Sequence, residues 1–384
     1  MIHALSRLGI LMLLIATTFM TSCTDPDDNQ PIIVDTLNPA LDTNPSANPV
    51  AMEVSISNVL TNQVDGVIIP TFQNYLNEMN QLLSQVDQFV TDIRLDSKPQ
   101  GDGGLGVVAD AYIEAYTAYQ AAAAHHYFAT VSNDLINTTN IYPIDPDLLN
   151  DLVLNQSFNF NSTVQQEANG FPALDYLLYG SDDLVADLQD EPERLGFMLE
   201  LVTAMRDGAE LLVMSWTGPL RDDFTNSIGL ESGSSISQQL NGVVRYLENH
   251  IRDNKIGFVI GRGSEDNSID PNPRHREGFF QSRIDDSDDI SLGLLRAAIE
   301  EMEDIYLGAT ETGGEGLGYE ELLIDGKQTI LDVAIKDQYD LIYDIIDGST
   351  SISTDDVLYN SVDDLIILYR SQLLPALNIQ VDDQ

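Results

Sequence analysis

Apolar residues recur every three or four positions along most of this chain, and that spacing restricts the fold more than any other feature. The first such run includes Val64, Phe72, Met79 and Phe89. Residues at this spacing lie on one face of a helix, where they can be buried together. Stretches in which apolar and polar residues alternate, as in a half-buried strand, are scarce. The sequence therefore predicts an all-α fold.

The same spacing predicts a second helix between Leu105 and Tyr119, and further helical stretches along the rest of the chain. These stretches cover residues 193–216, 234–254, 290–307, 319–346 and 361–377. Segments rich in Gly, Pro, Asn and Asp separate them. We predict one helical domain over residues 51–380, built from two helical bundles packed together, over about 51–216 and 217–380.

The N-terminus has the pattern of a bacterial targeting signal. Arg7 precedes an apolar run over residues 8–20, which is too short to span a membrane as a helix. Two small residues then precede Cys23, the only cysteine, in an order that resembles a lipobox, where lipoproteins are cleaved and lipidated. We predict a signal peptide over residues 1–22 and a lipid on Cys23. The alternative is an ordinary signal peptide with an incidental cysteine.

The segment after Cys23 is predicted to be a tether, and the charge of the chain excludes some partners. Residues 23–50 are rich in Asp, Asn, Thr and Pro without periodicity, which predicts a flexible acidic tether. The whole chain has 62 acidic and 17 basic residues, a formal net charge of −45. Phosphate binding needs basic patches, so we expect no nucleic acid as a partner. The N-terminal lipid is the only membrane contact that we expect, in the outer membrane, on its periplasmic or surface face.

Residues 170–180 carry a single acid inside an apolar helix start. Pro172 suits the first helical turn, where a missing N–H costs no hydrogen bond. Asp175 follows about one turn later, among residues that should be buried, so its carboxylate must be paired, protonated or bound to a ligand. This stretch resembles the signature of the imelysin family. That family comprises bacterial envelope proteins, many of them lipoproteins, linked to iron acquisition and once classed as peptidases.

The resemblance extends over residues 59–377, because the segments 233–237, 255–257 and 305–308 are similar to further landmarks of the family. It implies an all-helical fold of two bundle-like halves, with a site in the cleft between them.

The site motif of that family is Gly-x-His-x-x-Glu, which is thought to bind metal. In this chain Gly170 is retained, Pro172 replaces the histidine, and Asp175 replaces the glutamate. Proline has no ligand atom, and one short carboxylate makes a poor transition-metal site. The resemblance therefore implies the position of a site, with a carboxylate facing the cleft, but neither the metal nor the peptidase role.

Four other residues are candidates for the cleft. Tyr112 and His125 lie on or just after the predicted second helix, and Arg274 belongs to a group of six basic residues between positions 252 and 283. Glu277 lies among them, near a glutamate that the family often carries. The alternative interpretation is structural: the cations neutralise nearby acids, and His125 with its neighbour is a partly exposed pair. The predicted ligand-binding set is Gly170, Pro172, Asp175, Tyr112, His125, Arg274 and Glu277.

Three functions remain open at this point. We predict a non-enzymatic envelope lipoprotein that binds a small ligand, iron-related or of another kind, or an envelope protein partner. The alternatives are a metallopeptidase of the imelysin type and a surface-displayed scaffold for protein interactions. The chain has no His-Glu-x-x-His motif, and we expect no catalytic residue and no cofactor, with iron or another metal as the alternative.

Overall fold

The computed structural model shows a helical protein and confirms the predicted all-α fold. It describes residues 54–95, 103–127, 138–160, 162–181, 183–262, 273–283, 289–309, 316–352 and 356–382. Within these ranges there is no β-strand. They belong to one compact unit, Ala51–Gln384. The predicted signal peptide, the tether and Cys23 lie outside the described residues.

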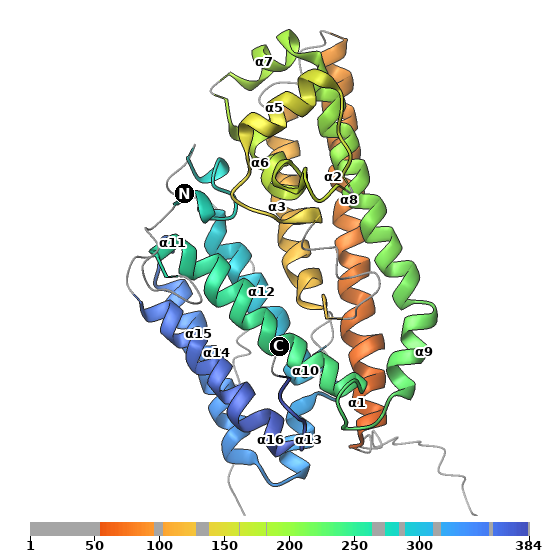
Figure 1. The fold of residues 1–384 in the computed structure, drawn as a ribbon, viewed down its shortest axis with the longest axis vertical. Coiled ribbons are helices and arrows are strands. Elements are labelled where there is room, and N and C mark those ends of the chain that lie inside the picture. Colours follow the sequence, from red (N-terminus) through yellow and green to blue (C-terminus); the bar gives the residue numbers. More distant parts are fainter. Residues whose placement is uncertain are drawn as a thin grey trace, which may run out of the picture. The chain divides into compact units, whose positions relative to one another are not determined.

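Long helices form the first part of this unit (Figure 1). Helix α1 (Ile56–Asn62) and the π-helix η1 (Gln63–Ile68) lead directly into α2 (Ile69–Arg94). Pro70 follows η1 directly, and because proline has no N–H, it interrupts the helical hydrogen bonding at this junction. Helix α2 packs against both α3 (Gly103–Ala124) and α8 (Pro192–Trp216). The apolar face recognised in the sequence, including Phe72 and Met79, is buried in these contacts.

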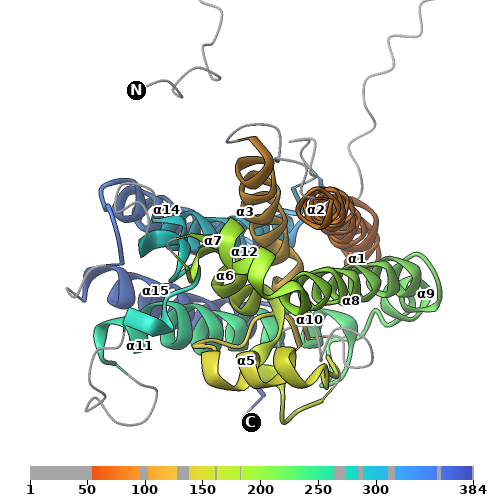
Figure 2. The same ribbon diagram turned by 90° about the horizontal axis from the view of Figure 1, so that it is seen from above.

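Short helices cover one end of this bundle, as Figures 1 and 2 show. They are α5 (Pro146–Asn155), the 3₁₀-helix η2 (Gln166–Ala168), α6 (Gly170–Tyr179) and α7 (Leu184–Asp190). Helices α5, α6 and α7 all contact α8. The predicted signature helix is therefore present as α6, seated on the long bundle.

The second part begins with α9 (Pro219–Asn226) and α10 (Ser235–Arg245), and α10 continues without interruption into a π-helix, η3 (Tyr246–Gly257). Helix α11 (Phe258–Ile260) ends this segment at Gly261, whose φ is 86°. Two 3₁₀-helices, η4 (Pro273–His275) and η5 (Gln281–Arg283), follow. Of these, η4 contacts α11, and η5 contacts α6.

Of the remaining helices, α12 (Ile290–Leu307) and α15 (Val357–Leu368) pack against η3. Helix α12 is followed by α13 (Tyr319–Asp325) and α14 (Thr329–Asp347). The chain ends with α15, which runs through the π-helix η6 (Tyr369–Leu373) into α16, Leu374–Ala376. Helix α15 packs on both α14 and η3.

Helix α12 joins the two parts of the unit, because it packs against α3 as well as against α13 and α14. The contact between α3 and α12 crosses the boundary predicted near residue 216. The division into two halves stays a prediction. No helix in the described ranges combines the length and the apolar character needed to cross a bilayer.

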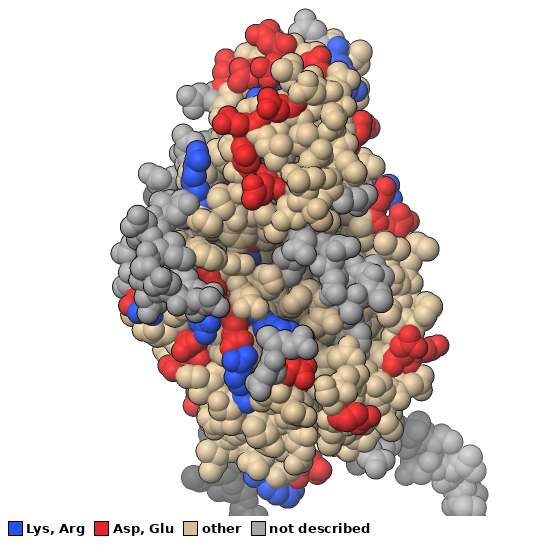
Figure 3. Space-filling model, in the orientation of Figure 1, with Lys and Arg blue, Asp and Glu red and all other residues tan. Residues whose placement is uncertain are grey.

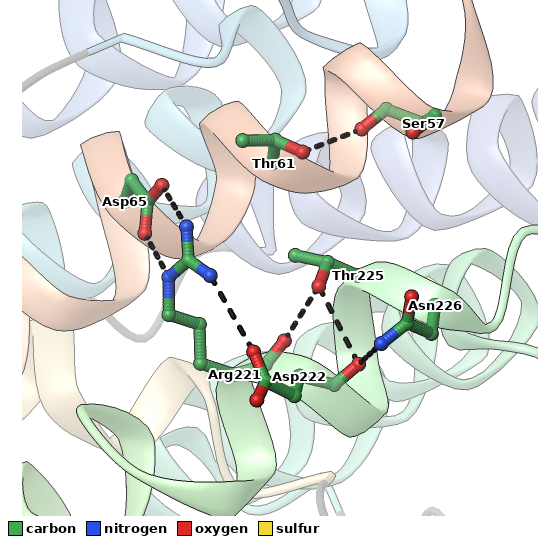
Figure 4. A network of polar contacts seen from close by, with 7 residues as sticks. All are labelled: Ser57, Thr61, Asp65, Arg221, Asp222, Thr225 and Asn226. Atoms are coloured by element: carbon green, nitrogen blue, oxygen red, sulfur yellow. Dashed lines mark hydrogen bonds and ion pairs between the residues drawn. The ribbon is translucent and has the colours of Figure 1, made fainter.

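A surface ion pair joins α9 to η1 (Figure 4). Arg221 Nε and Nη2 donate to the two carboxylate oxygens of Asp65, both at 2.7 Å. On the same helix, the Thr225 hydroxyl donates to the carbonyl oxygen of Arg221, and Asn226 donates to that of Asp222. Both charged side chains are more than one-third exposed, so water weakens their attraction and the pair contributes little to stability.

Candidate functional site

The start of α6 requires glycine at position 170. Gly170 has a φ of 72°, in the left-handed region that residues with a Cβ avoid. A Cβ added there would lie 2.0 Å from the carbonyl oxygen of Thr139, so the neighbouring chain also leaves no space. The side chain of Asn169 accepts a hydrogen bond from the Gly170 N–H at 2.7 Å. These contacts fix the direction in which α6 leaves the loop, and hence the position of Asp175.

Asp175 is buried, and it holds another segment of the chain. Its exposed fraction is 2%. Oδ2 accepts a hydrogen bond from the N–H of Phe280 at 2.7 Å, and Oδ1 accepts one from the N–H of Gln281 at 3.0 Å. Burial raises the pKa of Asp175 to about 7, and the two amide donors oppose that rise. The carboxylate thus fastens the start of η5 to α6.

The cavity next to Asp175 is small. Pro172, Asp175, Arg274 and Glu277 share its wall, and its volume is about 20 Å³. A single water molecule needs roughly 10–15 Å³ of such space. The structure therefore brings four of the predicted site residues together, but around a space with room for little more than one water. A ligand contact by Asp175 stays a prediction.

At pH 4, replacing Asp175 with asparagine is expected to lower the free energy of unfolding by about 1–3 kcal/mol, because one of the two backbone donors, Phe280 or Gln281, loses its acceptor. The folded pKa of Asp175 lies above the unfolded value of about 3.9, so the proton is held more tightly in the folded state. The contribution of this group is full below pH 4 and is lost as the pH rises through 7. Urea unfolding of Asp175→Asn between pH 4 and 8 should lack that decline. Parallel curves for the two proteins would contradict this assignment.

Tyr112 lies in an aromatic cluster beside Asp175. Its ring centroid is 6.2 Å from that of Phe171 and 5.7 Å from that of Tyr116. Tyr116 and Phe171 are stacked, with centroids 4.4 Å apart. Burial, and then the charge of Asp175, raise the pKa of Tyr112 well above its usual value. Tyr112 is therefore a neutral core residue next to α6, and it lines neither of the two cavities beside α6 and η3.

His125 lies apart from the other predicted residues. Its ring is fully buried, and its Nε2 is 2.5 Å from Glu301 Oε1. Its Nδ1 lies 3.0 Å from the hydroxyl of Tyr127, while Thr71 Oγ1 donates to Glu301 Oε1 at 3.1 Å. These contacts join α3, α12 and α2. Both ring nitrogens are occupied, and His125 lines neither cavity beside α6 and η3, so the structure does not bring it to the site.

A buried ion pair connects η3 to the segment before η5. Lys255 Nζ lies 2.5 Å from Glu277 Oε2, and each residue has an exposed fraction of 3%. Nζ also donates to Gln120 Oε1 at 2.6 Å. Glu277 Oε1 accepts from Asn140 Nδ2 at 2.6 Å and from Gln120 Nε2 at 3.2 Å. Burial lowers the pKa of Lys255, and the charge of Glu277 opposes that change.

The π-helical geometry of η3 turns its polar residues toward a single cavity. In an α-helix, with 3.6 residues per turn, Lys255 would lie about half a turn away from Tyr246. The i→i+5 bonding of a π-helix widens the turn to more than four residues, so positions four and about nine apart come together. Tyr246, His250, Asn254 and Lys255 all line the same cavity. π-Helical turns are frequent at functional sites.

That cavity has a volume of about 200 Å³. A cavity of roughly 150 Å³ can hold benzene, so a small organic molecule fits. Tyr119, Asn140, Tyr246 and Lys255 form its buried wall, whereas Asn254, Phe258 and His275 are half-buried. The Tyr119 hydroxyl is buried and has no hydrogen-bond partner within the described part of the chain. A buried hydroxyl without a partner is uncommon in proteins, and this one belongs to a residue that lines a cavity.

Most of the basic residues between positions 252 and 283 are paired with acids. Arg252 contacts Asp253 and Asp363, Arg262 contacts Asp356, and Arg276 contacts Asp289. These contacts agree with the interpretation that the cations neutralise nearby acids. Arg274 is exposed and lines the small cavity, and the Arg283 side chain lies outside the described residues.

The residues around Pro172 and Asp175 do not fit a metal ion. Pro172 offers no ligand atom, and each oxygen of Asp175 already accepts a backbone N–H. Within the described ranges, no group of three or more His, Cys, Asp or Glu side chains could hold a metal.

The sequence did not single out Gln120, Asn140, Tyr246 or Asn254. Tyr246, His250 and Asn254 are four residues apart, which places them on one face of a helix, and that spacing is the signal in the sequence. Asn140 stands in a loop without any pattern that marks it.

Comparison with known proteins gives the same fold. A protein-family model described as Imelysin matches residues 68–357. The chain is similar to an iron-regulated protein A precursor from Parabacteroides distasonis, with a TM-score of 0.66 and 16% identity over 84% of this chain and 94% of that one. It is also similar to an imelysin-like protein from Psychrobacter arcticum, with a TM-score of 0.64 and 13% identity over 87% and 99%. No curated protein matches the sequence.

Proposed function

This chain belongs to the imelysin family, and from that premise we propose that it is a cell-envelope lipoprotein that binds a small, iron-related ligand without catalysing a reaction. The binding site in this proposal is the cavity of about 200 Å³ beside η3, which we call the η3 cavity. The observation that carries the proposal is that cavity. Its wall contains a buried lysine and a buried hydroxyl that has no hydrogen-bond partner among the described residues.

The envelope location and the link to iron have separate support. The similar protein from Parabacteroides distasonis is described as an iron-regulated protein A precursor. The N-terminal pattern ending at Cys23 favours removal of a signal peptide and attachment of a lipid. In this proposal the lipid holds the protein at the outer membrane, and the folded unit is free to meet its ligand.

Binding is favoured over peptide cleavage because of the groups around the η3 cavity. Lys255 is held by Glu277, and burial lowers the pKa of His250 to about 4, so this imidazole is neutral near pH 7. The signature residues do not fit a metal that could activate water. If the protein were only a scaffold for protein interactions, we would expect side chains to fill the site. The η3 cavity instead has room for a small molecule.

The test is a thermal-shift screen of the purified mature protein against ferric ions, haem, ferric chelates and small organic ions. At least one of these should raise the melting temperature, because a ligand that binds only the folded state stabilises it. Asn254→Leu, in the η3 cavity, should abolish the shift. Asn77→Leu, an exposed position on α2 with the same chemical change, should leave the shift intact. No shift with any compound, or a shift that Asn254→Leu preserves, would refute the proposal.

A further inference from the structure

The wall of the η3 cavity has no acidic residue among the described residues, in a protein that has many. The chain carries 62 acidic and 17 basic residues. On the face in Figure 3, acidic side chains gather over the end of the bundle that carries α5 and α7. The one charged residue in the cavity wall is Lys255. Its partner, Glu277, belongs to the wall of the smaller cavity instead. This distribution disfavours a bare cation as the ligand.

The buried part of the wall offers hydrogen-bond donors. A lysine ammonium has three N–H donors, and Lys255 directs two of them to Gln120 and Glu277, which leaves one. The Tyr119 hydroxyl has no acceptor within the described ranges. Burial raises the pKa of Tyr119 well above its usual value, so the hydroxyl keeps its proton and can donate it.

Neutral donors complete the same wall. Asn140 uses one amide N–H to contact Glu277 and has a second. Asn254 and the imidazoles of His250 and His275 also line the cavity. Each neutral imidazole supplies one N–H. The His275 ring stacks on Phe258, with centroids 5.1 Å apart, which supports its orientation.

We propose that the η3 cavity binds a small organic oxyanion, a di- or tricarboxylate, with one carboxylate between Lys255 and Tyr119. This inference rests on the proposed function, because it names the chemical class of the ligand at the same site. Hydrogen bonds to a charged acceptor are stronger than neutral ones, and the low dielectric of a buried site strengthens them further. The second carboxylate meets the amides and imidazoles of the same wall. The volume of about 200 Å³ suits acids of the size of succinate, malate or citrate.

The test is isothermal titration of the mature protein with citrate, malate and succinate, and with triethyl citrate as an uncharged probe. At least one acid should bind, and the ester should not. Tyr119→Phe should weaken binding of that acid by roughly tenfold or more, because a hydrogen bond to a charged group is lost.

Tyr75→Phe is the matched control. The Tyr75 hydroxyl is also buried without a partner within the described ranges, and the Tyr75 ring lies 5.8 Å from that of Tyr119, but Tyr75 does not line the η3 cavity. The affinity of the Tyr75→Phe variant for the acid should equal that of the wild type. Both variants should fold, since removing an unpaired buried hydroxyl leaves no group unsatisfied.

The outcomes separate this inference from the proposed function. One outcome is that no acid binds, while the ester, a ferric ion or another uncharged or cationic probe binds and this binding requires Asn254. That outcome would overturn the oxyanion inference and leave the proposed function standing. Equal affinities of Tyr119→Phe and the wild type would also overturn the inference. If the protein binds iron-free citrate and ferric citrate with the same affinity, the oxyanion site is supported and a specific link to iron is refuted. Failure of every probe would refute both.

Discussion

Replacing Lys255 with methionine is expected to lower the free energy of unfolding by about 3–5 kcal/mol. The ammonium group of Lys255 is 2.5 Å from Glu277 Oε2, and both side chains are buried. Methionine has a similar length but no charge, so the Glu277 carboxylate would remain inside the protein without its counter-ion. Urea denaturation followed by circular dichroism measures this loss.

The double variant Lys255→Met/Glu277→Gln provides the decisive comparison. Glutamine removes the unpaired charge and keeps an oxygen for the Asn140 amide, so most of the lost stability should return. Lys336→Met is the surface control. Lys336 contacts Glu320 and Asp332 but is more than one-third exposed, so we expect a change below about 1 kcal/mol. If the stability losses of the two single variants, Lys255→Met and Glu277→Gln, add up to the loss of the double variant, the ion pair is not the source of the destabilisation.

Acidification from pH 7 to pH 5 is expected to remove about 4 kcal/mol of stability through two histidines. Burial lowers the pKa of His126 to about 3 and that of His250 to about 4. The two rings are 5.4 Å apart, so a proton on one also opposes a proton on the other. In the unfolded chain both titrate near 6.5. The unfolded state therefore binds more protons, and stability is full above pH 6.5 and falls as the pH decreases.

The measurement is the slope of unfolding free energy against pH for His126→Phe/His250→Phe and for the wild type. Phenylalanine keeps an aromatic ring at both positions but cannot take up a proton. The double variant should lose about 4 kcal/mol less than the wild type over the same pH range. His275→Phe is a control at a ring whose pKa burial lowers less, and it should change the slope less. Identical slopes for the double variant and the wild type would show that these histidines do not couple folding to pH.

The long helices could be predicted because their packing depends on one regular apolar face. The predicted stretch 290–307 coincides with α12, and 193–216 differs from α8 by one residue. The stretch 319–346 was predicted without a break, but the structure divides it into α13 and α14. Lys327 adopts a φ of 63° between them. The apolar period continues across that turn, so the pattern alone could not reveal it.

The candidate site was less predictable than the fold. The signature correctly indicated the start of α6 and the burial of Asp175, because a glycine-led helix with one embedded acid is a local pattern. The η3 cavity instead combines Tyr119, Asn140, Lys255 and His275, which come from separate elements without a shared motif. Only the tertiary fold brings them together. The 3.6-residue period used to predict helices also cannot place side chains along a π-helix.

The geometry of η3 has a consequence for related chains of different length. A π-helical turn accommodates an additional residue compared with an α-helical turn. Deleting the exposed Asn249 would favour reversion to α-helical bonding and would rotate Asn254 and Lys255 relative to Tyr246. The cavity could then be lost while every residue in its wall was retained. For relatives of this protein, an alignment gap within η3 would thus be as informative about ligand binding as a substitution of Lys255.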